Sequence, residues 1–185
     1  LAFCGRALRH VEVKLSNGDS GEILVRSDAM MARYWRNIKA SKDILVDGWL
    51  ATGDLAKIDD DGFVYILDRK NDMIVTGGEN VYPREVEDVL AGHSAVAEVA
   101  VFDRPHERWV QEVVAAIVLR PGSYVEEHEI VSYAKGRLAH YKCPKEIYFV
   151  ETLPRNGAGK VLRKTLRAMV SDGVMKFVKK DQEHG

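Results

Sequence analysis

The sequence predicts an α/β (α+β) domain with a short mixed sheet and flanking helices, preceded by a β-rich segment. In residues 1–70, apolar and polar residues alternate between turn signals, which is typical of strands. After residue 77, β-branched apolar runs alternate with helical patterns. Because the pattern changes between these regions, we place a domain boundary at about residue 70, giving segments 1–70 and 71–185.

The composition is that of a globular protein and excludes several classes. Of 185 residues, 46% are hydrophobic and 30% charged, and the net charge of −1 gives no support to nucleic-acid binding. No apolar run approaches the roughly 20 residues of a membrane span. The start lacks an initiator Met and an apolar signal core, so we expect a fragment that begins in mid-domain.

Cysteine and histidine spacing argues against a metal or disulfide site. Cys4 and Cys143 lie far apart and match no metal or redox spacing, so we predict free thiols and a cytoplasmic location. The six histidines include no His-x-x-x-His pair, so we expect no bound metal in this chain.

The first segment reads as hairpins. Asn17-Gly18 is a turn signal, and the acidic run 59–62 is expected at a solvated hairpin tip. That run lacks the spacing of an EF-hand loop. Residues 30–37 are ambiguous between a strand and a short helix. The expected strands are residues 11–15, 21–26, 55–58 and 63–67.

The stretch 68–87 joins the two segments. A charged run is followed by a short strand at 73–75, a sharp Gly77-Gly78 break and a helix that starts at Pro83. Gly92 is expected to end that helix. Farther on we expect strands at 96–102, 113–119 and 147–150, helices at 126–139 and 161–170, a glycine-rich loop at 154–160 and fraying after Ser171. The second of these strands is apolar throughout and should be central, with both faces covered.

Three groups of residues invite a chemical reading beside an ordinary structural one. Asp54 follows Thr52-Gly53, where an Asp usually caps a turn, although its two oxygens also suit vicinal sugar hydroxyls. Arg69 would then add a second contact. Gly77-Gly78 is a plain tight turn by itself, or a place where backbone approaches a ligand.

The loop PRNGAGK fails the test for a phosphate-binding loop. The pattern G-x-x-x-x-G-K-[ST] needs Gly at Pro154 and Ser or Thr at Val161. What remains is Lys160 on a mobile glycine loop, where it can reach a phosphate or carboxylate.

Taken together, four motifs resemble the carboxyl-terminal part of adenylate-forming enzymes, the superfamily of acyl-CoA synthetases, adenylation domains and luciferases. The motifs are GEILVRS, GWLATGDLA, DRKNDMIVTGGENVYPREVE and PRNGAGKVLRK, within residues 21–164. The resemblance implies a β-rich end of the large N-terminal domain, followed by a small C-terminal lid domain that rotates after adenylation.

The same resemblance implies roles for individual residues. Asp54 would bind the ribose hydroxyls of ATP and of the acyl-adenylate, with help from Arg69. Lys160 would contact the carboxylate and the α-phosphate during adenylation, where negative charge accumulates. Asn71 lies at the hinge position, which is commonly Asp or Lys in the family.

The wording GGENVYPREVE is typical of members that transfer the acyl group to coenzyme A. Rotation would bring Gly77 and Gly78 to the path of the thiol. Tyr141, Lys142 and Lys145 resemble a segment that meets the nucleotide end of CoA, although Cys143 replaces a basic residue found in some relatives. Trp109 either flanks CoA or anchors its own loop.

The resemblance therefore implies a fragment of an ATP-dependent acyl-CoA synthetase that is inactive alone. The carboxylic acid, ATP and CoA would be its substrates, and the Mg²⁺ site and acyl pocket would lie in the missing N-terminal domain. A fatty or aliphatic acid is a family-level expectation, and an aryl acid and a homodimer are left open. The alternatives are an adenylation domain that loads a carrier protein and a non-catalytic lid or interaction module.

Overall fold

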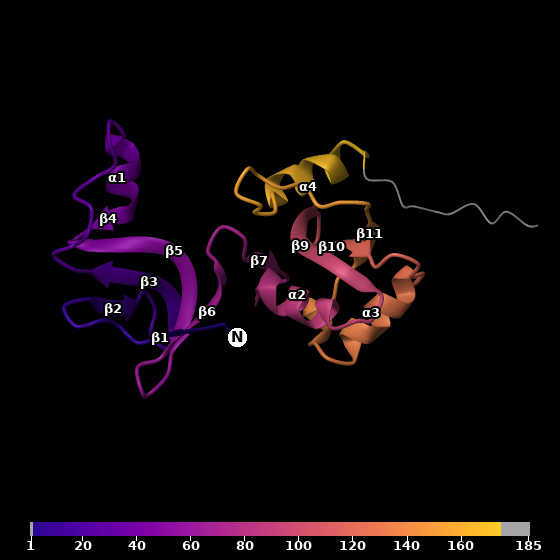
Figure 1. Ribbon diagram of the computed structural model, residues 1–185, viewed down its shortest axis with the longest axis horizontal. Helices are drawn as coiled ribbons and strands as arrows, with labels where there is room; N and C mark the ends of the chain where they lie inside the picture. Colours follow the sequence, from indigo (N-terminus) through magenta and orange to yellow (C-terminus); the bar gives the residue numbers. More distant parts are fainter. Residues whose placement is uncertain (1, 175–185) are drawn as a thin grey trace, which may run out of the picture. The chain divides into compact units, whose positions relative to one another are not determined.

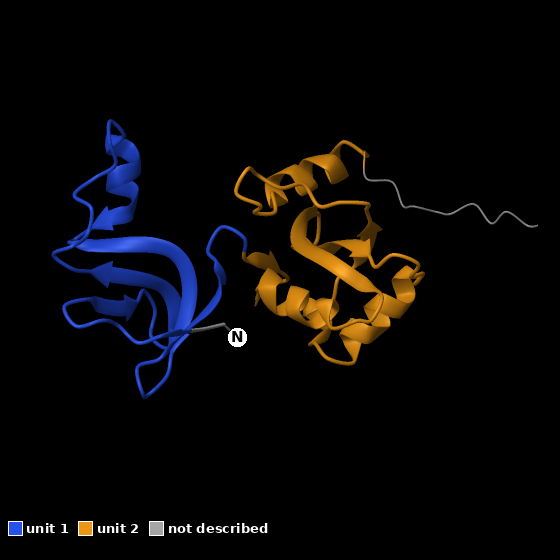
Figure 2. Ribbon diagram, in the orientation of Figure 1, with its two compact units in different colours: residues 1–72 blue, residues 73–185 orange. Residues whose placement is uncertain are grey.

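The computed structural model describes residues 2–174. The chain divides into two compact units, Leu1–Asp72 and Met73–Gly185, which are coloured separately in Figure 2. The fraying expected after Ser171 concerns mainly residues 175–185, which lie outside the described part of the chain.

The first unit is a β-sheet with one short helix (Figure 1). Its elements are β1 (Ala2–Gly5), β2 (Glu12–Leu15), β3 (Ser20–Arg26), α1 (Ile38–Ile44), β4 (Leu45–Val46), β5 (Trp49–Ile58) and β6 (Val64–Arg69). The strand order is β1-β6-β5-β3-β2, with β4 also paired to β5, and every pairing is antiparallel. Ile23, Ala56 and Val64 form its small buried core.

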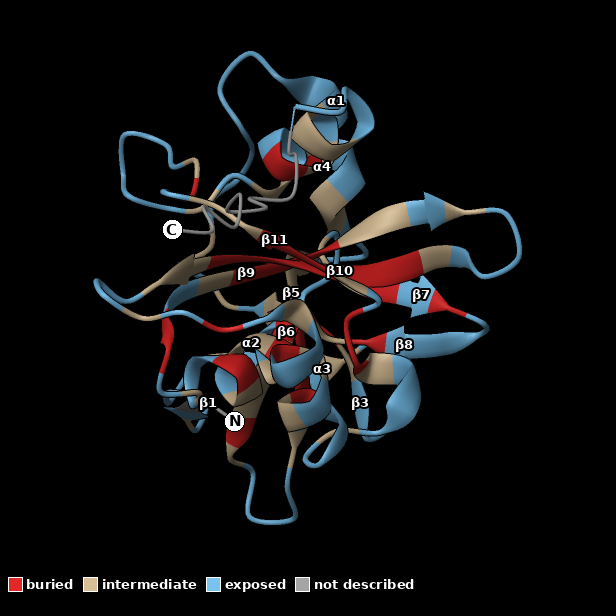
Figure 3. Ribbon diagram, turned by 90° about the vertical axis from the view of Figure 1, so that its right-hand side faces the viewer, coloured by how far each residue is buried: buried red, intermediate tan, exposed pale blue. Residues whose placement is uncertain are grey.

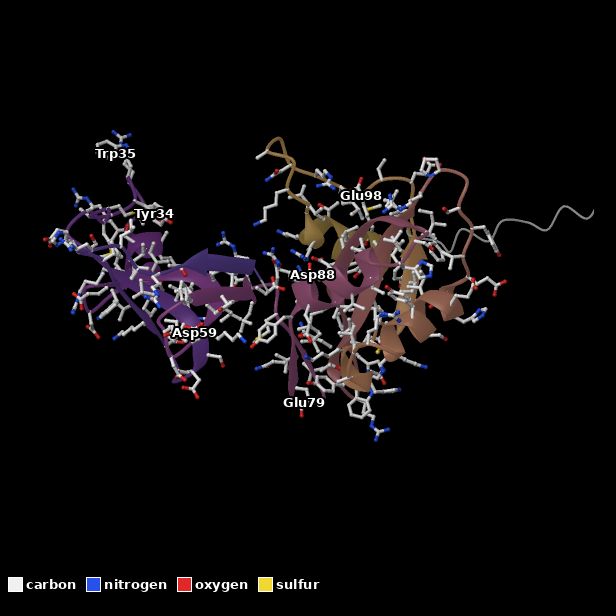
Figure 4. All side chains as sticks on the ribbon, turned by 60° about the horizontal axis from the view of Figure 1, so that its bottom comes forward. Tyr34, Trp35, Asp59, Glu79, Asp88 and Glu98 are labelled. Atoms are coloured by element: carbon white, nitrogen blue, oxygen red, sulfur yellow. The ribbon has the colours of Figure 1, made fainter. Side chains whose placement is uncertain are left out.

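Local sequence explains much of this sheet. The predicted β2–β3 hairpin is confirmed. The acidic tip between β5 and β6 is also confirmed, and Figure 4 labels Asp59 there. Its carboxylate accepts the N–H groups of Asp61 and Phe63, at 3.1 and 2.9 Å, and the Phe63 bond is the main reason why the pKa of Asp59 is lowered.

The ambiguous stretch 30–37 forms neither strand nor helix. Tyr34 and Trp35 are exposed on it and are labelled in Figure 4. The unpredicted helix α1 begins directly afterwards, because the Asn37 side chain accepts the Ala40 N–H at 3.0 Å and caps it.

The expected turn at Thr52-Gly53 is wrong: these residues lie inside the long strand β5. The β3–β5 pairing moves from Glu22↔Leu55 to Leu24↔Ala51, so β5 carries two additional residues there. Gly53 has φ +76°, a left-handed conformation that suits glycine in such a bulge. Asp54 therefore lies on a bulged strand and caps no turn.

The second unit is built on a mixed sheet, as predicted. Its elements are β7 (Ile74–Thr76), β8 (Glu79–Val81), α2 (Pro83–Ala91), β9 (Val96–His106), β10 (Val110–Leu119), α3 (Glu127–Lys135), a 3-10 turn (His140–Lys142), β11 (Glu146–Phe149) and α4 (Arg163–Ser171). The order is β11-β10-β7-β8, with β9 also paired to β10. Only the β10–β11 pairing is parallel among these described strands.

Helices cover both faces of this sheet, with α4 on one side and α2 and α3 on the other (Figure 3). Residues 113–117 of β10 are at most 1% exposed, which confirms the central, doubly covered strand. Pro83 starts α2 and Gly92 ends it, as predicted. A capping box of Glu126 and Glu129 starts α3. Within residues 2–174, no helix has the length and apolar character needed to cross a bilayer.

Candidate functional site

Asp54 and Arg69 lie side by side on neighbouring strands of the first unit. They are register partners in the β5–β6 pair, and the Arg69 Nε lies 2.8 Å from the Asp54 Oδ1. Their side chains are 29% and 53% exposed, so both remain accessible to a ligand. A carboxylate beside a guanidinium, on a fixed pair of strands, can bind hydroxyls and an anionic group together.

The bulge that carries Asp54 is held by side chains. The Thr52 hydroxyl donates to the Ile23 carbonyl at 3.0 Å and accepts the Asp54 N–H at 3.1 Å. Sequence reasoning missed Glu22, whose buried carboxylate accepts the Gly53 N–H at 2.9 Å. The signal was available in the motif GEILVRS, where a Glu directly precedes the apolar run Ile-Leu-Val of the strand.

The hinge candidate Asn71 lies in a turn at the end of the first unit. The Asp72 N–H donates to the Arg69 carbonyl at 3.0 Å, which closes a four-residue turn around Lys70 and Asn71. Asn71 is exposed and is not among the non-glycine residues with positive φ. Its role as a pivot stays a prediction.

Gly77 and Gly78 form the two-residue turn between β7 and β8. Their φ angles are +60° and +88°, the conformation of a type I′ turn, which favours glycine at both positions. A Cβ on Gly77 would lie 3.0 Å from the Trp109 Cε3, whereas a Cβ on Gly78 would meet no atom within 4 Å. The open side of the turn is therefore at Gly78.

Trp109 is brought against this turn by the β9–β10 hairpin. Its carbonyl accepts the Gly77 N–H at 3.2 Å, and the His106 Nδ1 accepts the N–H groups of Arg108 and Trp109. The Arg108 guanidinium stacks 4.6 Å from the indole ring, which stays 41% exposed. Trp109 thus anchors its loop and also offers an open face.

Lys160 lies on a loop with internal hydrogen bonds, and the expected mobility of this loop stays a prediction. The Asn156 side chain accepts the Ala158 and Lys160 N–H groups at 3.0 and 2.9 Å, and Arg155 pairs with Val161 as an isolated bridge. Lys160 itself is exposed. Asn156 is a second residue that sequence reasoning missed, although the Asn-Gly pair that follows Arg155 is a turn signal.

In the segment proposed to meet CoA, residues 141–145, only some side chains are exposed and without an ion-pair partner. Lys142 Nζ lies 2.7 Å from the Glu85 carboxylate in the first turn of α2, so its charge is already paired. Tyr141 is 37% exposed and Lys145 is exposed. Cys143 is buried, and this burial raises the pKa of its thiol.

The segment with Lys142, proposed to meet CoA, and the loop with Lys160, proposed to act in adenylation, adjoin opposite faces of the sheet in the second unit. Cys143, next to Lys142, packs into the cluster under α2 and α3, whereas Val161, next to Lys160, packs into the cluster under α4. No group of three or more His, Cys, Asp or Glu side chains suited to a metal ion occurs among residues 2–174.

Comparison with known proteins identifies the class. Residues 85–160 match the model of the AMP-binding enzyme C-terminal domain. The predicted resemblance to the carboxyl-terminal part of adenylate-forming enzymes is confirmed, and so is the α/β fold class.

Individual relatives are CoA ligases. The chain is 44% identical over 179 residues to the long-chain-fatty-acid–CoA ligase FadD13 of Mycobacterium tuberculosis, covering 93% of this chain and 35% of the relative. It resembles the crystal structure of ATP-bound MatB from Rhodopseudomonas palustris with a TM-score of 0.86 and 36% identity, covering 94% of this chain and 36% of that one. The o-succinylbenzoate CoA synthetase MenE of Bacillus subtilis, in complex with its acyl-adenylate, gives 0.81 and 39%, with 86% and 34% covered. The chain thus spans about a third of the length of these relatives.

Proposed function

We propose that this chain is the carboxyl-terminal part of an AMP-forming acyl-CoA synthetase. Residues 1–70 would end the large adenylation domain, and residues 71–185 would form its mobile lid. The whole protein would join a carboxylic acid to ATP as an acyl-adenylate, release pyrophosphate and then transfer the acyl group to CoA. Its relatives with CoA-ligase names support this class of reaction.

The observation that carries the proposal is the separation of two sets of residues on one lid. Val161, next to Lys160, packs into the cluster under α4, whereas Cys143, next to Lys142, packs into the cluster under α2 and α3. A lid with adenylation and thiol-transfer groups on different faces must turn between the two half-reactions. The exposed turn at Asn71 is the proposed place for this rotation.

Each residue has a stated task in this scheme. Asp54 and Arg69 would bind the ribose hydroxyls in both half-reactions, because they belong to the fixed domain. The Lys160 ammonium would neutralise charge on the α-phosphate and the carboxylate as pyrophosphate leaves. Mg²⁺, which we assign to the rest of the protein, would supply charge neutralisation on the phosphates.

The thiol-transfer groups would act in the second pose. The open backbone at Gly78 would border the thiol path, and Trp109 and Tyr141 would offer aromatic faces to CoA. Lys145 is the free cation of the segment, since Glu85 already pairs with Lys142. A cytoplasmic location remains a prediction from the two free cysteines.

The first test is Lys160→Ala in the full-length enzyme. We expect carboxylate-dependent exchange of pyrophosphate into ATP to fall by at least about a hundredfold, because a preorganised charge on the developing anion is lost. Thioester formation from supplied acyl-adenylate should be nearly unchanged. The matched control is Lys164→Ala, which removes another exposed lysine four residues later on α4.

Normal exchange in Lys160→Ala would contradict the role of this lysine. Release of AMP that depends on a carrier protein rather than on CoA would identify the alternative adenylation domain. A panel of aliphatic and aryl acids is needed to name the substrate, because relatives act on acids as different as fatty acids and o-succinylbenzoate.

A further inference from the structure

Glu22 is a buried carboxylate of the first unit to which the proposed chemistry gives no task. It lies on β3 and is 8% exposed. Burying a carboxylate is costly unless charge and hydrogen bonds compensate it. A buried Glu on this strand therefore calls for partners that matter to the fold or to the site.

Its two oxygens hold two different segments. Oε1 accepts the Gly53 N–H at 2.9 Å, and Oε2 lies 2.8 Å from the Lys70 Nζ. The Lys70 N–H also donates to the Gly53 carbonyl at 2.8 Å. These three contacts form a closed ring that joins β3, the bulge of β5 and the end of β6.

Two members of this ring are sequence neighbours of the candidate nucleotide-binding residues. Gly53 directly precedes Asp54, and Lys70 directly follows Arg69. On its β3 side Gly53 has no regular strand pairing, because the β3–β5 register is interrupted between Glu22 and Leu24. One side chain thus replaces the missing ladder hydrogen bond and also holds the residue that precedes Asn71.

We infer that Glu22 is a positioning residue, which holds the Asp54–Arg69 pair in its binding geometry and fixes the first-unit side of the turn at Asn71. The contribution to catalysis rests on the proposed function, whereas the tether itself does not. The two parts can therefore fail separately.

Hydrogen exchange on the full-length enzyme, in which the first unit is part of its complete domain, tests the tether. In Glu22→Gln the amide keeps an acceptor for Gly53 but loses the charge that pairs with Lys70. We expect amide exchange at residues 53, 70 and 72, whose N–H groups are hydrogen-bonded, to rise about tenfold, the effect of losing one charge-assisted hydrogen bond. Glu12→Gln is the matched control, since it breaks an exposed pair with Arg26 in the same sheet and should leave these amides unchanged.

Kinetics of the full-length enzyme test the positioning role. Glu22→Gln should raise KM for ATP by about tenfold and slow both half-reactions, relative to Glu12→Gln. Lys70→Met leaves the Gly53 bond in place and should slow thioester formation more than adenylation. If Glu22→Gln does not fold, Lys70→Met is used alone for both the hydrogen-exchange and the kinetic measurements.

Unchanged exchange at these amides would overturn the proposal. Faster exchange with unchanged half-reactions would also overturn it, because Glu22 would then be only structural. A wild-type enzyme without carboxylate-dependent pyrophosphate exchange would refute the proposed function, and the exchange experiment would still decide whether the tether exists.

Discussion

Val110 occupies a backbone conformation that β-branched residues rarely adopt. Its φ is +68°, at the first position of β10, directly after Trp109. The side chain is 73% exposed, so packing gives little in return for this strain. Strained residues tend to occur beside functional loops. Val110 ends the loop whose Trp109 contacts Gly77.

Replacing Val110 with Gly should therefore stabilise the second unit. Relief of left-handed strain is worth about 1–3 kcal/mol, and the added freedom of the unfolded chain costs about 0.5–1 kcal/mol. We expect a net gain of about 1 kcal/mol, measured by urea unfolding. Val75→Gly, on β7 of the same unit and without positive φ, should instead lower stability.

For single residues, sequence patterns predicted the chemical role of a side chain better than its interaction partners. Asp54 and Arg69 were predicted as a pair because a carboxylate and a guanidinium flank recognisable motifs, and they do lie together. Glu85 as the partner of Lys142 was missed, since the two are 57 residues apart and nothing local couples them. Asn156 was missed because glycines around it made the loop look mobile.

The β7–β8 hairpin is the element that links fold to proposed chemistry. Two residues with positive φ are needed for its turn, and the Trp109 indole closes one side of it. The open side of the turn is therefore at Gly78 and not at Gly77. This asymmetry was invisible in the sequence, because Trp109 follows Gly77 by 32 residues and belongs to another hairpin.

Gly78→Leu in the full-length enzyme should slow thioester formation from supplied acyl-adenylate by about tenfold or more, while adenylation changes little. The added side chain would occupy the open side of the turn, which we assign to the thiol path. Gly78→Ala is the control, because it carries the same backbone penalty with little bulk. Equal losses in both half-reactions would contradict the rotation proposed for this element.

Element prediction succeeded where periodicity was long and failed where elements were short. The central strand β10 and the helix α2 follow from apolar runs and from Pro83. The three-residue strand β8 and the seven-residue α1 lack enough periodic positions to stand out. The strand β5 was divided because Thr-Gly is a turn signal, and tertiary pairing with β3 overrode it.

The whole molecule consists of two units with very different cores. Among the described residues of the second unit, fifteen buried ones form one cluster and seven form the other, on opposite faces of its sheet. The main cluster of the first unit has only three buried members. Small cores stabilise a domain poorly, so most of the folding free energy of this chain should reside in residues 73–185.

We therefore expect residues 73–185 to fold when expressed alone, whereas residues 1–72 should not fold cooperatively. Cys143 is the only cysteine of the longer segment and serves as the reporter. Because burial raises the pKa of its thiol, the reactive thiolate is scarcer in the folded state at any given pH. Labelling with a disulfide reagent at pH 8 should be at least about a hundredfold slower than in denaturant.

The same shift gives a pH dependence with a defined sign. A thiol whose pKa is raised by folding stabilises the fold below its ordinary value of about 8.5, and this contribution is lost as the pH rises through the folded value. The urea midpoint of segment 73–185 should fall at alkaline pH, and Cys143→Ala should lessen that fall. Labelling of Cys143 at the denatured rate in the isolated segment would show that the second unit depends on the first.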